Sequence, residues 1–347
     1  MTLPPLKLVL TAVGCPGAST LIRMLKANGE REIAIHGVDM RADAIGRFLC
    51  DGFDLVPAGA SPDYIPALAA VVERVRPDLL FVQSSHEIEI VARQRDVFEA
   101  LGATVLADGV KGIETAGDKA LMHAACTEIS VPQPTLLLPR SLDEFVAGAH
   151  ELGYPDVPVC FKPPVAKGSR GFRILSDEVD RVHELLHERP INRYMTLPEF
   201  ESLLRGVEPF PRLMLMEYVD APEITVDLFA DKGEMVFHQT RTREEFLTGL
   251  AMAFKTIDRP ELVDLSRKVV RHLGLDYYQS VQWIGGKLLE INPRVSTFVY
   301  QKDFNIPYLG IKYALGELTR DDVAGVQARV RTSRRSVRYY DQVFWDE

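Results

Sequence analysis

The residues best suited to chemistry form the stretch Glu290-Ile-Asn-Pro-Arg294, which ends an apolar run. Glu290 and Asn292 are two residues apart, so in a strand their side chains point to the same face. Hard oxygen ligands at the end of a strand suit Mg²⁺, whose remaining positions are filled by water and phosphate oxygens. Arg294 lies two residues further on and can reach the same phosphate. A purely structural interpretation must explain why two polar residues and an arginine follow an apolar strand.

A second stretch has the composition of a phosphate-binding loop. It runs from Cys160 to Ile174 and reads CFKPPVAKGSRGFRI. Lys162 is expected to end a strand, and 167–171 to form a glycine loop before the next strand. A lysine that faces a site, together with backbone N–H groups that close over oxygens, can hold a triphosphate. The alternative is an ordinary hairpin with surface lysines.

A third stretch suits the rest of a nucleotide. The backbone at Glu217–Val219 can hydrogen bond the edge of adenine, and the run Glu223-Ile-Thr-Val-Asp227 follows it. Strand alternation places the three polar side chains of that run on one face. A carboxylate there could accept hydrogen bonds from ribose hydroxyls. An edge strand with a solvated acidic face explains the same residues equally well.

The turn Gly14-Cys-Pro-Gly17 follows the first apolar run of the chain. A glycine-rich turn between a strand and a helix can hold phosphate on its N–H groups. A dinucleotide fingerprint needs a third spaced glycine, which is missing, and an acid after the second strand, which Asp39 could supply. An NAD-dependent enzyme therefore stays open beside a packing turn. A nucleophilic Cys15 is disfavoured, because a thiolate needs a base or cation nearby.

The elements that must position these residues change character along the chain. Before residue 112, apolar runs alternate with amphipathic stretches, which predicts a doubly wound parallel sheet. The expected strands are 6–13, 33–38, 79–83 and 104–106, and the expected helices are 21–27, 63–75 and 88–101. Later segments predict helices at 116–128, 141–152 and 260–273, short strands over 159–236 with a helical insert at 178–206, and a hairpin of 278–284 and 287–292. Ser141 and Glu144 are expected to form a capping box.

Composition narrows the class of protein. The chain has 347 residues, 46% hydrophobic and 26% charged, which is typical of a globular protein with more than one core. Its net charge of -9 argues against a nucleic-acid partner or an anionic membrane surface. No apolar run is long enough to span a membrane, and no secretory signal is recognised. The four cysteines lack metal-binding spacing, so we expect reduced thiols in a cytoplasmic protein.

Taken together, these stretches resemble the ATP-grasp superfamily, and most closely the synthetase domains of the carbamoyl-phosphate synthase large subunit. The resemblance covers about residues 5–318 and rests on an ordered set of motifs. They are the Gly-rich turn, Asp118-Lys119, the Lys162 strand with its glycine loop, Glu217-Tyr-Val219, Glu223-x-x-x-Asp227, Gln282 and Glu290-x-Asn292-Pro-Arg294. The fold implied is α/β and α+β, with a doubly wound pre-ATP-grasp domain at 1–112, a small lobe with a lid loop at 113–220, and a C-terminal lobe with the metal site at 221–347.

The resemblance also implies roles for single residues, with ATP and Mg²⁺ as cofactors and Mn²⁺ as the other candidate ion. The residues implied in ATP binding are Lys119 and Lys162 on the phosphates, Gly168, Ser169, Arg170 and Gly171 in the lid, Glu217, Tyr218 and Val219 at adenine, and Glu223 at ribose. Those implied in metal binding are Gln282, Glu290 and Asn292. Arg294 would stabilise the transferring phosphoryl group.

The run Arg241-Thr-Arg243-Glu-Glu-Phe-Leu-Thr-Gly249 is similar to stretches of stand-alone ATP-grasp ligases, in which basic residues face the acyl phosphate or the substrate carboxylate. Both arginines are expected to follow a strand at Met235–Gln239, with a flexible stretch at 244–249 that could close on the substrate. We therefore favour Arg243, and with it Arg241, as a cation for the carboxylate. The alternative is a pair of solvated arginines beside two glutamates.

The expected function is an ATP- and Mg²⁺-dependent ligase that activates a small carboxylate as an acyl phosphate for attack by an amine. The chain holds one synthetase copy, whereas the carbamoyl-phosphate synthase subunit has two. A related enzyme acting on bicarbonate or carbamate is therefore an alternative. A third candidate is a nucleotide-binding regulatory protein without turnover, which the intact set of Lys162, Glu290, Asn292 and Arg294 disfavours. The resemblance makes a homodimer the expected assembly.

Overall fold

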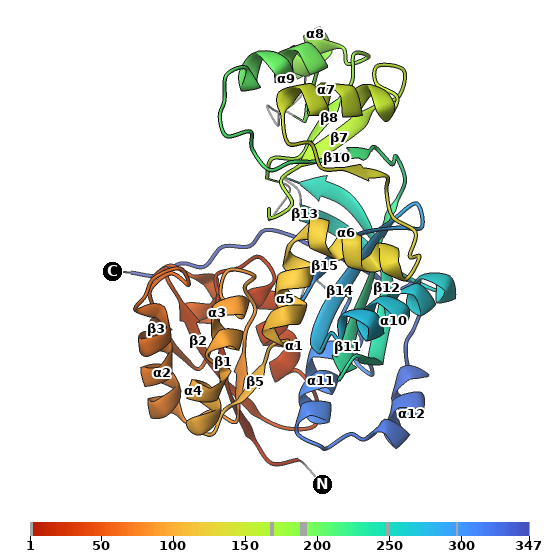
Figure 1. The fold of residues 1–347 in the computed structure, drawn as a ribbon. Coiled ribbons are helices and arrows are strands. Elements are labelled where there is room, and N and C mark those ends of the chain that lie inside the picture. The colour runs from red at the N-terminus through yellow and green to blue at the C-terminus, as the bar shows by residue number, and fades with distance from the viewer. Residues whose placement is uncertain (1–2, 167–169, 188–192, 248–249, 296–297, 347) are drawn as a thin grey trace.

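The computed structural model describes residues 3–166, 170–187, 193–247, 250–295 and 298–346, and within these ranges it contains three β-sheets in succession along the chain (Figure 1). The first sheet has five parallel strands in the order β3-β2-β1-β4-β5. Its strands are β1 (Leu6–Leu10), β2 (Ile33–Asp39), β3 (Gly52–Leu55), β4 (Leu79–Phe81) and β5 (Thr104–Leu106). Its helices are α1 (Ala18–Lys26), the 3₁₀ helix η1 (Ile45–Phe48), α2 (Tyr64–Val75), α3 (Ile88–Arg93) and α4 (Arg95–Ala100).

Both faces of this sheet are buried, as the continuous apolar runs predict. Leu8 and Leu10 point into a core with α1, while Val9 points into a second core with α2, α3 and α4. The doubly wound arrangement is therefore confirmed. The single helix expected at 88–101 is wrong, because Gln94 leaves helical geometry with φ of −115° and ψ of 25°. The short strand β3 was not predicted.

The second sheet forms the upper lobe in Figure 1 and has the order β6-β10-β7-β8-β9. Its strands are β6 (Leu136–Leu137), β7 (Val159–Lys162), β8 (Arg173–Leu175), β9 (Tyr194–Met195) and β10 (Met214–Glu217). Before it come α5 (Val110–Gly117) and α6 (Lys119–Glu128), and within it α7 (Leu142–Glu151), α8 (Arg181–His187) and α9 (Leu197–Leu204). Phe145 of α7 stacks on Phe200 of α9, with ring centroids 3.9 Å apart, over the sheet residues Phe161 and Leu215.

One helix start and one capping box differ from expectation. The helix expected at 116–128 begins at Lys119, because the Asp118 side chain caps it by accepting from the N–H groups of Ala120 and Leu121. Ser141 caps α7 as predicted and accepts from the Glu144 N–H at 3.1 Å. The capping box itself is wrong, since the Glu144 carboxylate accepts from the Arg140 N–H at 2.7 Å.

The third sheet has six antiparallel strands in the order β15-β14-β11-β12-β13-β16. They are β11 (Glu223–Asp231), β12 (Glu234–Leu247), β13 (Leu250–Ile257), β14 (Tyr277–Ile284), β15 (Lys287–Asn292) and β16 (Arg335–Val337). Its helices are α10 (Pro260–Leu273), α11 (Ile306–Ala314), the 3₁₀ helix η2 (Arg320–Asp322) and α12 (Val323–Gln327). The predicted helix 260–273 is confirmed, and the hairpin of β14 and β15 lies as expected around Gly285-Gly286.

This sheet shares a hydrophobic core with the first sheet. Tyr278 of β14 stacks on Phe81 of β4 with ring centroids 5.0 Å apart, and Phe229 and Phe237 join the same cluster. On its other face, α10 packs against Trp283 and Val281. The first and third sheets are therefore held side by side at the base of the upper lobe, as Figure 1 shows.

Two expectations for the third sheet are corrected. Arg241 and Arg243 lie inside β12 and do not follow a strand, and residues 244–247 extend that strand and pair with β13, although 244–249 was expected to be a flexible stretch. The C-terminal segment packs on the rest of the molecule, since β16 pairs with β13 and Trp345 lies 5.0 Å from Phe48 between ring centroids. Within the described ranges, no helix has both the length and the apolar character needed to cross a membrane.

Candidate active site

One face of the third sheet carries the predicted polar residues of β11, β12, β14 and β15. The strand register aligns Glu223 with Arg243, Thr225 with Gln282, and Gln282 with Glu290. The residues on this polar face are Glu223, Thr225, Asp227, Gln239, Arg241, Arg243, Ser280, Gln282, Glu290 and Asn292. Because side chains alternate along a strand, the intervening apolar residues point to the α10 core. The sheet thus brings ligands from four strands onto one surface.

Two lysines reach this surface from outside the third sheet, Lys119 from the start of α6 and Lys162 from the upper lobe. Lys119 Nζ lies 3.7 Å from Glu290 Oε2 and donates to the Ala166 carbonyl at 3.0 Å. Lys162 ends β7, as predicted, and is buried. Burial lowers the pKa of Lys162, although the negative charge of Glu290 opposes that change. Burial also disfavours the charged form of Glu290, but Lys119 and Lys162 outweigh it and hold the pKa of Glu290 below its ordinary value.

The predicted metal ligands lie together on the polar face. Asn292 Nδ2 donates to Glu290 Oε1 at 3.1 Å, and Gln282 Oε1 accepts from Arg243. Burial raises the pKa of Glu223, against the charge of Arg243, and the negative charge of Glu290 adds to that rise. A divalent cation would relieve this repulsion, and the amide and carboxylate oxygens fit Mg²⁺.

The predicted metal ligands include fewer acidic residues than a site in which protein side chains alone surround the metal. No group of three or more His, Cys, Asp and Glu side chains gathers at a metal-binding spacing in the described ranges. Gln282, Glu290 and Asn292 supply one carboxylate and two amides. Mg²⁺ retains several waters and shares phosphate oxygens, so such a set is sufficient for it. The metal assignment stays a prediction.

The two arginines of β12 differ in their surroundings. Arg241 is buried and binds Asp227, with Nε 2.6 Å from Oδ2 and Nη2 3.2 Å from Oδ1. The Arg243 side chain is 16% exposed, and its Nη1 lies 2.8 Å from Glu223 Oε2. That oxygen makes no aligned hydrogen bond to any described residue. Neither arginine is the solvated surface residue of the alternative interpretation, and only Arg243 lies beside the predicted ATP-binding and metal-binding residues.

Arg294 follows β15 and faces the first domain. Its Nε contacts Ser85 Oγ in the loop after β4, and its Nη1 donates to the Val295 carbonyl at 3.2 Å. Burial lowers the pKa of Arg294, while Cys15 and Glu290 oppose that change. This contact links Arg294, which is predicted to bind phosphate, to the edge of the first sheet at which β4 ends.

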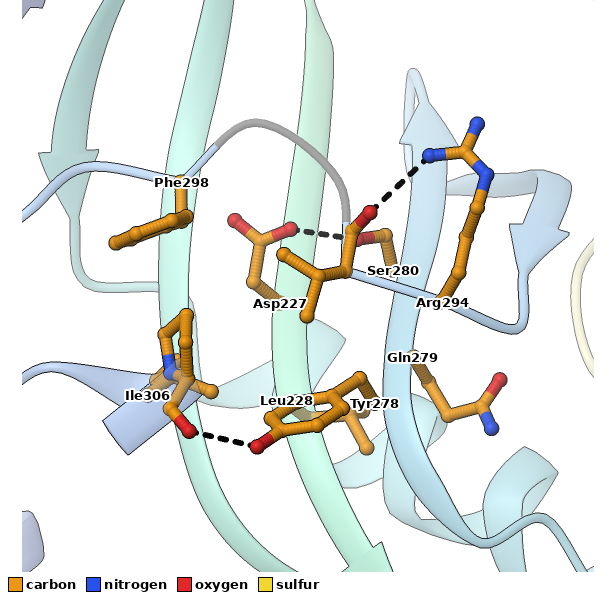
Figure 2. A pocket seen from close by; sticks show the side chains of 10 residues that line it. Asp227, Leu228, Tyr278, Gln279, Ser280, Arg294, Phe298 and Ile306 are labelled. Carbon is orange, nitrogen blue, oxygen red and sulfur yellow. Dashed lines mark hydrogen bonds between the residues drawn. The ribbon is translucent and has the colours of Figure 1, made fainter. Parts of the chain in front are cut away.

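A cavity of about 20 Å³ lies beneath Arg294, against Asp227 and Ser280 (Figure 2). Ser280 Oγ donates to Asp227 Oδ1 at 2.7 Å, and Tyr278 closes the lower side through a 2.6 Å hydrogen bond to the Pro307 carbonyl. This volume is enough for about one water molecule. The cavity is therefore too small for a substrate, and the residues around it support the polar face.

The predicted adenine-binding backbone lies at the junction of the upper lobe and the third sheet. The Glu217 N–H donates to the Thr135 carbonyl at 3.1 Å, and the Glu217 carboxylate binds Lys287 of β15. In the described parts of the chain, the Val219 N–H has no hydrogen-bond partner. Tyr218 lies between Glu217 and Val219 in sequence, and its hydroxyl accepts a hydrogen bond from Arg193 at 3.3 Å. The Val219 N–H is therefore available to an adenine nitrogen.

The predicted lid falls partly outside the described residues, which include neither Gly168 nor Ser169. Gly171 has φ of +75°, and a Cβ there would come within 2.6 Å of Pro163 Cδ. Glycine is therefore required where the loop returns to β8. Arg170 is exposed at the same end of the loop.

The Gly14–Gly17 turn is shaped by Asp39. Its Oδ2 accepts from the Gly14 N–H at 2.7 Å, and its Oδ1 accepts from the Arg41 N–H at 3.0 Å. A Cβ at Gly14 would lie 2.9 Å from Asp39 Oδ2. The acid that a dinucleotide site would use for ribose thus closes the turn, which weighs against the NAD alternative. Burial raises the pKa of Cys15, which disfavours an activated thiolate there.

Arg338 is a candidate residue that the sequence did not single out. Its backbone N–H donates to the Met252 carbonyl at 2.7 Å beside β16, and its guanidinium lies 5.9 Å from the Phe254 ring centroid. Burial lowers the pKa of Arg338, and the charges of Arg241 and Arg243 add to that change. No acidic residue forms an ion pair with it in the described ranges. No predicted element in the sequence indicated that this arginine returns to the polar face.

The chain is similar in sequence to proteins of known activity. A family model described as ATP-grasp in the biosynthetic pathway with Ter operon matches residues 209–337. The arginine-specific carbamoyl phosphate synthase large chain of Eremothecium gossypii is 24% identical over 322 residues, which is 86% of this chain and 27% of that protein. The carbamoyl phosphate synthase large chain of Archaeoglobus fulgidus is 26% identical over 289 residues, or 77% of this chain and 24% of that protein. The chain thus spans about a quarter of the length of these relatives.

Solved structures share the fold over most of the chain. A biotin carboxylase complex with β,γ-ATP from Campylobacter jejuni has a TM-score of 0.66 at 17% identity, covering 92% of this chain and 73% of that one. The biotin carboxylase domain dimer of 2-oxoglutarate carboxylase from Hydrogenobacter thermophilus, with MgADP and bicarbonate, has a TM-score of 0.65 at 19% identity, covering 92% and 72%. The predicted fold class, a doubly wound parallel sheet followed by mixed α and β elements, is confirmed, and these structures share it.

Proposed function

From the premise that the chain carries an ATP-grasp domain related to ATP-dependent ligases, we propose that it activates a small carboxylate as an acyl phosphate for attack by an amine. The observation that carries the proposal is the convergence of Lys119 of α6 and Lys162 of the upper lobe on Glu290 of the third sheet, beside Asn292. A site with two cations beside a hard-oxygen pair matches a nucleotide triphosphate with its metal.

The proposed chemistry joins two anions. A carboxylate oxygen attacks the γ-phosphorus, ADP leaves, and an amine then displaces phosphate from the acyl carbon. Lys119 and Lys162 compensate the phosphate charge, and Arg294 supports the transferring group. Glu290, Asn292 and Gln282 would hold Mg²⁺, which supplies charge neutralisation at the phosphate oxygens when bound.

The substrate carboxylate needs a cation of its own, and Arg243 is our candidate. Its guanidinium lies beside Glu223 and Gln282 on the polar face, where a fork can hold a carboxylate in two hydrogen bonds. Arg241, which is two residues before Arg243 in β12, supports the position of Arg243 through its own bond to Asp227. Arg338 adds positive charge from the C-terminal segment. The backbone at 217–219 would bind adenine, Glu223 the ribose, and residues 168–171 would close over the phosphates.

A bicarbonate-activating enzyme is the second candidate. The relatives in the sequence comparison are carbamoyl phosphate synthase large chains, and the Hydrogenobacter thermophilus domain is complexed with bicarbonate. That domain is a dimer, and a homodimer is our proposal for this chain as well. Bicarbonate and a larger carboxylate place the same charge at the γ-phosphate, so the substrate screen must contain both.

The test is a screen for ATP-dependent ADP release with pooled amino acids, other small carboxylates and bicarbonate, each with and without hydroxylamine. Hydroxylamine traps an acyl phosphate as a hydroxamate. We expect one pool to give ADP and a hydroxamate in equal amounts, only with ATP and Mg²⁺. ADP release without any trapped product from every pool would contradict the acyl-phosphate route.

A further inference from the structure

An arginine of the C-terminal segment lies at the border of the proposed active site. Arg338 follows β16, and its backbone N–H donates to the Met252 carbonyl of β13 at 2.7 Å. From there the chain runs across to the first domain, where Trp345 lies 5.0 Å from Phe48 between ring centroids (Figure 1). The Arg338 side chain is partly buried, so the fold holds it in place and leaves it open to a ligand.

The ring of Phe254 relates this guanidinium to the polar face of the third sheet. Arg338 Cζ lies 5.9 Å from the centroid of that ring, and Arg241 Cζ lies 5.0 Å from the same centroid. Phe254 is buried, so both guanidinium groups pack against one fixed side chain. Arg243 is two residues from Arg241 in β12. Arg338 therefore adjoins the arginine to which we assign the substrate carboxylate.

Arg338 lacks the anion that both of these arginines have. Arg241 Nε lies 2.6 Å from Asp227 Oδ2. Arg243 Nη1 lies 2.8 Å from Glu223 Oε2. In the part of the chain that the structure describes, no carboxylate forms an ion pair with Arg338. A partly buried guanidinium without an anion requires an explanation, because its charge is removed from water and not compensated.

The charges around Arg338 favour the binding of an anion. Burial lowers the pKa of Arg338, and the positive charges of Arg241 and Arg243 lower it further, while Cys15 opposes that change. Cys15 belongs to the Gly14–Gly17 turn of the first domain, so Arg338 lies within electrostatic reach of both the first domain and the polar face. A bound anion would offset the repulsion among the three arginines.

The other anions of the proposed reaction already have cations. Lys119 and Lys162 are assigned to the phosphates of ATP, and Arg294 to the transferring phosphoryl group. Arg243 is assigned to the carboxylate that is activated. Arg338 remains without an assigned anion, and its place beside Arg243 points to a second anionic group on the same substrate molecule.

We propose that Arg338 binds a second carboxylate of the acid that is activated, so that the substrate is a short dicarboxylic acid, an assignment that rests on the proposed function. A guanidinium holds a carboxylate in two parallel hydrogen bonds. Arg243 holds the carboxylate that attacks the γ-phosphorus and Arg338 holds the other, which determines the carboxylate that is phosphorylated. Bicarbonate has no second carboxylate, so this inference favours the carboxylate ligase over the bicarbonate enzyme.

The test compares the binding of succinate and butanoate, which have carbon chains of equal length but differ by one carboxylate. Saturation-transfer NMR follows both acids on the full chain with a non-hydrolysable ATP analogue and Mg²⁺. Arg338→Gln removes the charge, and Arg338→Lys keeps the charge without the fork. Arg335→Gln is the matched control, because Arg335 lies in the same segment with a side chain that is 72% exposed, 4.0 Å from Glu244. Thermal melts establish that each variant folds.

We expect succinate to bind about tenfold more tightly than butanoate to the unmodified protein and to Arg335→Gln. Arg338→Gln should remove this preference, and Arg338→Lys should retain part of it. Equal binding of the two acids to the unmodified protein, an unchanged preference in Arg338→Gln, or no binding of either acid would overturn the proposal. Weaker binding of the ATP analogue to Arg338→Gln would overturn it too, since it would place the arginine at the phosphates.

The second carboxylate could also come from the amine, if the amine is an amino acid. Glycine and methylamine test this source in the same assay, because glycine has a carboxylate that methylamine lacks. We expect Arg338→Gln to bind glycine and methylamine as the unmodified protein does. An advantage of glycine over methylamine that disappears in Arg338→Gln, with no preference for succinate over butanoate, would move the site to the amine and overturn the assignment to the acid.

Binding and turnover together separate this inference from the proposed function. A succinate preference that depends on Arg338, in a protein that forms no hydroxamate from any pool, would reject the ligase proposal and retain the dicarboxylate site. Hydroxamate formation without such a preference would do the reverse. In an active protein, Arg338→Gln should raise the KM for the dicarboxylic acid about tenfold and leave the KM for ATP unchanged.

Discussion

Two carboxylates on the polar face of the third sheet, Asp227 and Glu290, are held in different ways. Asp227 lies deep in the sheet and accepts three hydrogen bonds from Arg241 and Ser280, at 2.6, 3.2 and 2.7 Å. Glu290 lies at the outer end, accepts from Asn292 at 3.1 Å, and faces the ammonium groups of Lys119 and Lys162. The first carboxylate is bound by residues of its own sheet, whereas the second is surrounded by charges from elements outside that sheet.

This difference separates a structural role for Asp227 from a role of Glu290 in the reaction. Buried ion pairs with several aligned hydrogen bonds fix the position of their neighbours, and removing one partner leaves an uncompensated charge. Cations gathered around a carboxylate, with few aligned hydrogen bonds, instead fit a phosphate and its metal. We expect substitutions at Asp227 to affect stability and substitutions at Glu290 to affect turnover.

The largest effect is expected for Glu290→Gln. The amide keeps the shape but removes the charge from the metal-binding pair, so ADP formation should fall by about three orders of magnitude. Steady-state kinetics at saturating Mg²⁺ measure this, with circular dichroism as the check on folding. Glu261→Gln, on the exposed side of α10, is the matched control and should retain its rate. An unchanged rate in Glu290→Gln would remove this residue from the metal site.

Asp227→Asn should act on stability. It leaves the buried Arg241 without its anion, which costs about 3 kcal/mol of unfolding free energy. The midpoint of unfolding in urea should fall accordingly. Asp231→Asn is the control, because its contact with Arg320 is a surface ion pair at 3.6 Å and worth less than about 1 kcal/mol. Equal stability of both variants would mean that the deep pair does not support the sheet.

Arg243→Lys should have a smaller effect, confined to turnover. Lysine keeps the charge but loses the fork, so carboxylate-dependent ADP formation should fall about 30-fold while the Kd for ATP stays the same. Isothermal titration and ADP assays measure the two quantities separately. Arg259→Lys, at the exposed start of α10, should change neither. Loss of ATP affinity in Arg243→Lys would place the arginine at the nucleotide instead.

A preference for ATP over GTP of about tenfold is expected from the backbone at 217–219. The Val219 N–H lacks a partner among the described residues and can donate to a ring nitrogen of adenine. The corresponding position of guanine carries a hydrogen and would leave the N–H unpaired. Competition of the two nucleotides in the ADP assay measures the ratio, and equal rates would contradict adenine binding at this edge.

The smallest effect is expected at the loop 167–172. ATP with Mg²⁺ should slow proteolysis there by about threefold or more, because a closed loop is a poor protease substrate. The cleavage site is identified by mass spectrometry. Cleavage at the same rate with and without nucleotide would count against a lid.

Local patterns were enough to predict much of this molecule. Strand alternation placed Glu290 and Asn292 on one face, and the apolar stripe of 260–273 gave helix α10. Gly285-Gly286 marked the hairpin between β14 and β15. Each of these signals depends on residues that are close together in the sequence, so the sequence alone reveals them.

Long-range pairing could not be predicted in the same way. The bond of Arg241 to Asp227, the contact of Arg294 with Ser85, and the return of Arg338 beside β13 join segments far apart in sequence. The bond of Asp39 to the Gly14 turn likewise depends on how β1 and β2 pair. Nothing in the local composition of these residues shows whether a charged side chain is solvated or committed to a distant partner.

The central claim is that a carboxylate becomes an acyl phosphate on this chain, and oxygen transfer tests it most directly. A carboxylate that is active in the ADP screen is labelled with ¹⁸O, and the phosphate released after reaction with the amine is analysed by mass spectrometry. Our account predicts one ¹⁸O atom in each phosphate, because the attacking carboxylate oxygen stays bonded to phosphorus when the C–O bond breaks. Phosphate without ¹⁸O, or label in AMP, would contradict it.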